Sequence, residues 1–411
     1  MLEVHGAMNS SAKAVLPSSV VVMGGGRWAR VYVDELLQIL PVSTRVLVYS
    51  PRNSEAMFNW IISKGVDDRV SVFSSLPVMN ESDYTAVIIV NAAADHLKSI
   101  EWAISQNAPV LIEKPLALNS NALSVLINEA TRRGVYLAAA HVFLFAEYLS
   151  NFKNKIQSLI EIESLDIVWA DATKSTRHGE IKSFDPGVRV FEDCLPHVMS
   201  MLEIIQPGLS PKFVDIMLSR GGAHLNLVFS SANCRYTVCL IRNGIERRRI
   251  ITVSGKGRSF SLDFTHEPGT IVNCSETISA CPDWAVAQKP LSSMLSSFFE
   301  AAGGGCPDSR LATAVGMRAA SLSEEILPAY YAAQAQWLVQ NLFEEGDQDE
   351  GLRYALREIA LSGYSQALLI SEEKLSAIIK DIKSMADDPM IRHRLENRPI
   401  DFVLSLMLEN A

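Results

Sequence analysis

The sequence predicts an α/β protein with a doubly wound parallel sheet at its N-terminus, followed by an α+β part with a mainly antiparallel sheet and by a helical tail. Its composition is that of a packed globular chain, because 48% of the 411 residues are hydrophobic and 20% are charged. In the first third of the chain, short apolar segments alternate with segments of helical periodicity, which predicts parallel strands joined by helices. Strand-like segments with few helices between them follow, and the last part is helical in pattern.

The parallel sheet is expected because its strand segments are apolar on both faces, and helices cover both sides of such a sheet. We expect its strands at Val20–Met23, Arg45–Tyr49, Val70–Phe73, Ala86–Asn91, Val110–Glu113 and Val135–Ala140, and its helices at Val31–Leu40, Ser54–Lys64, His96–Gln106 and Ala122–Arg133.

A glycine-rich turn joins the first strand to the first helix. Gly24, Gly26 and Ala29 match the GxGxxG/A pattern, and Arg27 and Trp28 lie inside it. Small residues at these positions allow a tight turn and let backbone N–H groups approach a pyrophosphate. Because the pattern follows a strand and opens a helix, it predicts a dinucleotide-binding Rossmann domain. A tight turn without a ligand is the alternative.

The residues after the second strand predict which dinucleotide binds. An NAD site usually has an acidic residue there that binds the ribose hydroxyls, whereas this chain has Ser50 and Arg52. A hydroxyl and a guanidinium suit a 2′-phosphate, so NADP is favoured and NAD remains an option. The alternative is an ordinary polar turn, with Glu55 reaching back to the ribose.

The second half predicts a mainly antiparallel sheet, because tight turns such as Asn243-Gly244 connect successive strands. We expect strands at Ser164–Lys174, Lys212–Ser219, Leu225–Phe229, Cys234–Ile241, Arg248–Val253 and Ser259–Phe264, and helices at Pro290–Ala301, Arg310–Ile326, Gly351–Leu361, Glu372–Met385 and Ile400–Leu408. The predicted organisation is a flexible leader at 1–18, a dinucleotide-binding domain at 19–145, an α+β substrate and oligomerisation domain at 146–335, and a helical C-terminal extension at 336–411. The extension is expected to serve packing or dimerisation, and a partner-binding domain is the alternative.

Charge and cysteine usage exclude several classes of function. The chain has 37 Lys and Arg against 46 Asp and Glu, which gives a net charge of −9, so nucleic acid is not an expected partner. We interpret the basic triplet Arg247–Arg249 as a solvated strand edge. No apolar run has the length of a membrane helix, so no membrane partner is expected. The N-terminus lacks the pattern of a secretion signal and the six cysteines are irregularly spaced, which predicts reduced thiols in a cytoplasmic protein. Cys194 and His197 have no second ligand pair at metal spacing, so no metal site is expected.

Two further motifs carry a family resemblance. Glu113-Lys114-Pro115 ends the fifth strand, and it lies downstream of the segment Asn91–His96, which ends the fourth. Asp193-Cys194-Leu195-Pro196-His197 has the spacing D-x-x-x-H at the start of a helix. Over roughly residues 19–335 the chain resembles the Gfo/Idh/MocA oxidoreductases, the relatives of glucose–fructose oxidoreductase and inositol dehydrogenase.

The resemblance implies hydride transfer with a nicotinamide cofactor, a homo-oligomer formed on the outer face of the antiparallel sheet, and cofactor contacts from Asn91, His96, Glu113 and Lys114. For His96 the alternative is that it only begins its helix. The chain departs from the family in two places. The segment AHVFLFAEYLSNF lacks the Arg-Phe-x-Pro run that many members carry near the substrate, and the chain extends past the usual end. The substrate pocket is therefore expected to differ from that of simple sugar dehydrogenases.

The residues themselves support three catalytic roles. Lys114 ends a strand at the carboxyl edge of the sheet, where ligands of such folds bind, and its amine can hydrogen-bond a substrate oxygen. Asp193 and His197 are four residues apart and share one helix face, so the carboxylate can orient an imidazole, a group whose unperturbed pKa lies near neutrality. The alternatives are a solvated lysine at the strand end and a histidine that Asp193 satisfies without catalysis.

These observations lead to one main function and two alternatives. The main hypothesis is an NADP(H)-dependent oxidoreductase that transfers a hydride between nicotinamide and a secondary alcohol or ketone carbon of a sugar or nucleotide sugar. The first alternative is an NADPH-dependent imine (C=N) reductase in natural-product biosynthesis, since the segment after Ala140 is unusual. The second is a non-catalytic dinucleotide-binding sensor or scaffold, against which the presence of Lys114, Asp193 and His197 counts.

Overall fold

The structure, a computed structural model, describes residues 15–409 except for 78, 80–83, 174–175, 178–179, 182–183, 186, 232, 343–348, 363–370 and 386–387. Residues 1–14 of the predicted leader lie outside this range. The chain forms two compact units. The first contains the chain up to Ala117 with Asn121–Phe145 and Gln288–Ala314, and the second contains Leu118–Ser120, Ala146–Ala287 and the chain from Val315 onward. In the described part of the chain, no helix is long and apolar enough to cross a membrane.

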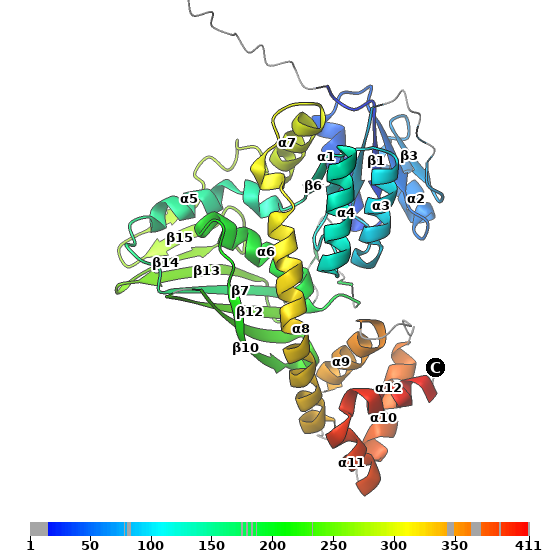
Figure 1. The fold of residues 1–411 in the computed structure, drawn as a ribbon, viewed down its shortest axis with the longest axis vertical. Coiled ribbons are helices and arrows are strands. Elements are labelled where there is room, and N and C mark those ends of the chain that lie inside the picture. The colour runs from blue at the N-terminus through cyan, green and yellow to red at the C-terminus, as the bar shows by residue number, and fades with distance from the viewer. Residues whose placement is uncertain are drawn as a thin grey trace, which may run out of the picture. The chain divides into compact units, whose positions relative to one another are not determined.

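The first unit contains the predicted parallel sheet (Figure 1). Its strands are β1 (Ser19–Met23), β2 (Arg45–Tyr49), β3 (Val70–Phe73), β4 (Thr85–Ile89), β5 (Val110–Ile112) and β6 (Leu137–Ala139). They pair in the order β3-β2-β1-β4-β5-β6, and every pairing is parallel. All five residues of the central strand β4 are buried, as expected for a sheet with helices on both faces. The doubly wound prediction is confirmed.

Helices of the first unit begin and end at recognisable signals. Strand β2 is followed by α2, which ends at Gly65, whose φ of +64° puts it in the left-handed region that favours glycine.

Helix α7 comes from far along the chain and packs against α1, where Ser292 donates a hydrogen bond to Glu35. The bounds are α1 (Arg27–Ile39), α2 (Ser54–Lys64), α3 (His96–Ser105), α4 (Ser120–Arg133) and α7 (Pro290–Ala302).

The second unit contains an eight-stranded, mainly antiparallel sheet, as predicted. Its strands pair in the order β10-β11-β12-β7-β13-β14-β15-β16, and only the pairing of β12 with β7 is parallel. The bounds are β7 (Ser164–Ala172), β10 (Lys212–Ser219), β11 (His224–Ser231), β12 (Cys234–Gly244), β13 (Arg248–Gly255), β14 (Arg258–Asp263), β15 (Thr270–Asn273) and β16 (Thr277–Ser279), with β8 (Thr176–Arg177) and β9 (Glu180–Ile181) as a separate pair. Residues alternate between buried and less buried along β11 and β12, because helix α6 (Val190–Ile205) packs on these two strands.

Not every residue of the basic triplet Arg247–Arg249 lies at a solvated strand edge. Strand β13 lies inside the sheet, between β7 and β14, and the Arg249 side chain that it carries is 1% exposed. Arg249 forms an ion pair with Asp171 and donates a hydrogen bond to the Ala170 carbonyl, so its charge is compensated inside the protein. The sequence interpretation was therefore wrong for Arg249, although Arg248 beside it is exposed.

The remaining helices of the second unit are α5 (Glu147–Ile156), α8 (Ala314–Asn341), α9 (Asp349–Ser362), α10 (Glu372–Ser384), α11 (Pro389–Asn397) and α12 (Pro399–Glu409). Helix α8 continues through Pro328, past its predicted end at Ile326, and it crosses the predicted boundary at residue 335. Helices α9 to α12 gather at the C-terminal end of α8 (Figure 1). They share a buried apolar core with α8 that includes Trp337, Leu356 and Ile379, so the tail packs as a small helical layer of its own.

Candidate active site

The glycine turn of the first unit has the geometry of a phosphate cradle. Gly24 has a φ of +142°, and a Cβ there would lie 2.9 Å from the Val90 carbonyl oxygen, so only glycine fits. A Cβ on Gly25 would lie 2.0 Å from Ser50 Oγ. A Cβ on Gly26 would meet nothing within 4 Å, so the space beside it is open. Gly26 is the N-cap of α1 without a side-chain cap, which leaves the first backbone N–H groups of the helix available to an anion. These residues fit the pyrophosphate of a dinucleotide.

The two residues predicted to select the cofactor differ in their surroundings. Ser50 is 2% exposed, and its Oγ accepts a hydrogen bond from the Asn53 backbone N–H at 3.2 Å. Arg52 has a 77% exposed side chain, and its guanidinium lies 3.3 Å from the Asp95 carboxylate. Ser50 therefore shapes the turn, while Arg52 is placed at the surface where a charged group can reach it. Sequence reasoning missed Asp95, which lies 43 positions further along the chain.

Glu113 connects the glycine turn to the end of the fifth strand. Its Oε1 accepts hydrogen bonds from Trp28 Nε1 at 2.8 Å and from the Tyr32 hydroxyl at 2.6 Å, and its Oε2 accepts one from the Lys114 backbone N–H at 2.9 Å. Burial, and then the Glu113 charge, raise the pKa of Tyr32, so the phenol stays protonated and donates. Three donors thus hold the buried carboxylate, which fixes the backbone from which the half-buried Lys114 projects.

His96 and Asn91 lie at the carboxyl edge of the same sheet. His96 is the first residue of α3 and is 1% exposed, with Nδ1 at 2.8 Å from the Pro115 carbonyl oxygen and Nε2 at 3.2 Å from that of Asn91. Burial lowers the pKa of His96, so the neutral ring has one N–H and donates to one carbonyl at a time. The Asn91 amide donates to Ser99 Oγ at 2.8 Å, and its buried Oδ1 has no hydrogen-bond partner among the described residues. A donor on a bound dinucleotide would satisfy that oxygen.

Asp193 and His197 lie on α6 in the second unit. The helix begins after Arg189, whose backbone N–H and guanidinium both donate to Glu192 in the first turn, at 2.8 and 2.9 Å. Asp193 Oδ2 accepts a hydrogen bond from Arg242 at 3.1 Å. One turn later the His197 ring stacks on Trp169, with 4.8 Å between the ring centroids and 21° between the planes.

The structure thus divides the three predicted catalytic residues between the two units. Lys114 belongs to the first unit with the glycine turn, and Asp193 and His197 belong to the second. Sequence reasoning missed Arg242 and Trp169 as neighbours of these two residues. The predicted strand ended at Ile241, one residue before Arg242, whereas β12 continues to Gly244.

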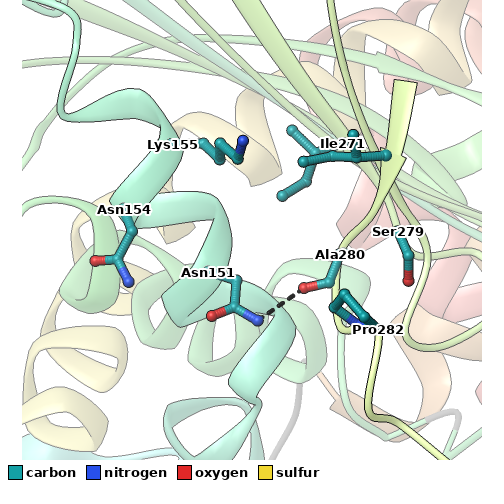
Figure 2. A pocket seen from close by; sticks show the side chains of 8 residues that line it. Asn151, Asn154, Lys155, Ile271, Ser279, Ala280 and Pro282 are labelled. Carbon is teal, nitrogen blue, oxygen red and sulfur yellow. Dashed lines mark hydrogen bonds between the residues drawn. The ribbon is translucent and has the colours of Figure 1, made fainter. Parts of the chain in front are cut away.

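A separate pocket of about 350 Å³ lies in the second unit and contains none of the predicted site residues. Figure 2 shows Asn151 and Lys155 of α5 on one side and Ile271 and Ser279 on the other. Asn151 Nδ2 donates a hydrogen bond to the Ala280 carbonyl at 2.9 Å across the pocket (Figure 2), which ties α5 to the edge of the sheet.

The close approach at the glycine turn gives a testable prediction. We expect Gly25→Ala to destabilise the protein by about 1–3 kcal/mol, because its Cβ would lie 2.6 Å from Ser50 Cβ as well as against Ser50 Oγ. Thermal melts measure the effect. The double variant Gly25→Ala/Ser50→Gly removes the obstructing side chain and is expected to recover most of the loss. Gly26→Ala is the stability control, and a Gly25→Ala protein as stable as that control would contradict this reading.

Comparison with known proteins agrees with this geometry. Residues 18–141 match the family model described as oxidoreductase family, NAD-binding Rossmann fold. No curated protein matches the chain in sequence.

Solved structures share the fold at low sequence identity. UDP-N-acetylglucosamine 3-dehydrogenase GnnA from Acidithiobacillus ferrooxidans is 17% identical, with a TM-score of 0.61 over 78% of this chain and 100% of its own. A variant of KijD10, a 3-ketoreductase from Actinomadura kijaniata solved with TDP-benzene and NADP, is 16% identical, with a TM-score of 0.63 over 76% of this chain and 98% of its own. A probable dehydrogenase from Thermotoga maritima is 16% identical, with a TM-score of 0.58 over 76% and 97%. Residues 18–141 therefore match the NAD-binding Rossmann domain of the Gfo/Idh/MocA oxidoreductases, and the solved structures show that the fold is shared.

Proposed function

We propose that this chain is an NADP(H)-dependent oxidoreductase that transfers a hydride between nicotinamide and a secondary alcohol or ketone carbon of a sugar or nucleotide sugar. The observation that carries the proposal is the link through Glu113, which joins the start of the cofactor-binding helix to the backbone of Lys114. The names of two structural neighbours, a nucleotide-sugar dehydrogenase and a 3-ketoreductase solved with NADP, support the substrate class.

The proposed mechanism assigns one task to each residue. The bound nicotinamide supplies or accepts the hydride. Lys114 donates a hydrogen bond to the reacting substrate oxygen, where partial negative charge develops. In oxidation His197 accepts the hydroxyl proton, and in reduction it returns that proton to the same oxygen. Asp193 orients the imidazole and stabilises its charged form.

Turnover measurements test this function. The purified chain is mixed with NADPH or NADP⁺ and a panel of nucleotide sugars, keto sugars and cyclic imines, and the nicotinamide absorbance is followed. Turnover of sugars supports the proposal. Turnover of imines alone would replace it with C=N reduction, and tight cofactor binding without any turnover would replace it with the sensor.

Cofactor preference gives a separate prediction. We expect Arg52→Ala to weaken NADPH binding by about 1.5–3 kcal/mol, roughly 10- to 100-fold, because a charge-assisted contact to the 2′-phosphate is lost, and to leave NADH binding nearly unchanged. Fluorescence titration with both cofactors measures it. Arg45→Ala is the matched control, since Arg45 is an exposed arginine at the opposite end of β2. Equal losses for the two cofactors would remove Arg52 from the 2′-phosphate site.

Two further features belong to the proposal. All six cysteines are free thiols, which supports a reducing, cytoplasmic environment. We also propose a homo-oligomer, which size-exclusion chromatography with light scattering measures directly.

A further inference from the structure

A buried arginine connects the candidate acid–base helix to the C-terminal helices. Arg242, at the end of β12, is 3% exposed, and its guanidinium donates hydrogen bonds to Asp193 Oδ2 at 3.1 Å, to the Tyr354 hydroxyl at 3.2 Å and to the Val188 carbonyl at 2.7 Å. Its Cζ also lies 4.7 Å from the ring centroid of Phe184. Burial disfavours this charge, but Tyr354 and Asp193 outweigh that effect and raise the pKa of Arg242, so it remains a cation. A buried cation with fixed partners holds them in place.

Tyr354 lies beside a polar cluster between α8 and α9. It is buried on α9, one turn before the buried Glu358. Glu358 Oε1 accepts hydrogen bonds from Tyr330 and from Gln334 Nε2, both on α8, the latter at 3.1 Å. Arg242 is therefore positioned from two sides, by its own strand and by a helix of the C-terminal extension.

We infer that Arg242 and Tyr354 are positioning residues for Asp193, and that helix α9 of the extension thereby sets the geometry and charge around His197. The inference rests on the proposed function, in which Asp193 orients His197. The guanidinium fixes Asp193 Oδ2 and compensates part of its negative charge. A carboxylate held in this way presents one geometry to the imidazole, and it stabilises the imidazolium less than an uncompensated carboxylate does.

Other charged groups surround α6 and stay unchanged in the test. On the side of β7, the His197 ring stacks on Trp169, and the Arg249 guanidinium lies 3.7 Å from the centroid of the same indole and pairs with Asp171. At the start of α6, Arg189 pairs with Glu192. Among the described residues, the charged side chains near the first turns of α6 include Arg189, Glu192, Asp193, Arg242, Arg249, Asp171 and Glu358, and Arg318 pairs with Glu203 in its last turn. Of these only Arg242 is altered below.

The test follows the His197 imidazole itself, in the full chain and without substrate. Histidine-labelled protein is titrated by NMR, and the His197 resonance is assigned by its loss in His197→Ala. Arg242→Gln removes a cation near Asp193, so we expect the titration midpoint of His197 to rise by roughly half a unit to one unit. Tyr354→Phe removes only a hydroxyl from α9, and it is expected to raise the midpoint by a smaller amount because Arg242 is held less firmly.

A matched control separates positioning from a general loss of packing. Tyr236→Phe removes a hydroxyl that donates to Gln206 at the opposite end of α6, so the chemical change is the same and the contact with Arg242 is untouched. Arg242→Lys keeps the charge and is expected to restore most of the midpoint. Wild-type midpoints in both Arg242→Gln and Tyr354→Phe would overturn the inference, and so would an equal shift in Tyr236→Phe. If Arg242→Gln does not fold, the titration midpoint of His197 in Tyr354→Phe alone decides whether the inference holds.

Kinetics then distinguish this inference from the proposed function. Once a substrate is found, Tyr354→Phe is expected to lower kcat about 3- to 10-fold with KM unchanged, and to move the His197-dependent limb of the pH profile to higher pH. Unchanged kcat and pH profile in Tyr354→Phe, with His197→Ala inactive, would overturn the positioning role alone. Full activity of His197→Ala would overturn the proposed catalytic role, whatever the NMR titration shows.

Discussion

Replacing His197 with alanine is expected to lower turnover by about 10²- to 10⁴-fold, the usual contribution of a positioned general acid–base group. Cofactor affinity is expected to change little, because the proposal assigns His197 a proton-transfer role and no contact with the cofactor. Steady-state kinetics and cofactor titration measure the two quantities, with thermal melts as a check on folding.

The matched control for this change is His393→Ala, since His393 is exposed on α11 and has no assigned role. It is expected to keep full activity. If His197→Ala also kept full activity, the proton would have to pass through another group, and Asp193 and His197 would be structural residues of α6.

The second large effect is expected from Lys114→Ala. Loss of this amine is expected to lower kcat/KM by about 10²- to 10³-fold and to impair both turnover and productive substrate binding. In the proposed mechanism the amine donates to the reacting oxygen in the ground state and in the transition state alike. Lys98→Ala, an exposed lysine on α3 of the same unit, is the control. The double variant Lys114→Ala/His197→Ala is expected to lose much less than the product of the two single losses, because the proposed mechanism assigns both groups to one oxygen. Strictly multiplicative losses would argue that they act at separate points.

The sequence predicted the parallel sheet well because the residues that end its strands and helices directly follow them in the sequence. Strand β2 ends before Ser50-Pro51 and helix α2 ends at Gly65, and both elements have the predicted bounds. The length of α8 was not predictable in this way, because Pro328 normally ends a helix and here lies inside one. The strands β15 and β16 were missed because they are short and mostly exposed, so they lack the continuous apolar run that marks the equally short, buried strand β5.

The candidate site shows the same division between local and distant signals. Gly24 to Ala29 and Glu113-Lys114-Pro115 could be recognised because each motif is continuous in sequence. Arg242 could not, because its partners Asp193 and Tyr354 are 49 and 112 positions away and nothing near it in sequence marks it as buried. Long-range ion pairs of this kind are visible only once the chain is folded.

The three donors around Glu113 also bear on how this domain can diverge during evolution. A lineage that lost the indole of Trp28 or the phenol of Tyr32 would leave a buried carboxylate with too few donors, so neither change is neutral by itself. Trp28, Tyr32 and Glu113 are therefore expected to be retained together. Their hydrogen bonds connect the glycine turn to the backbone of Lys114. Arg52, which we propose contacts the 2′-phosphate, is exposed and is not one of these donors, so a change at Arg52 leaves the contacts of Glu113 in place.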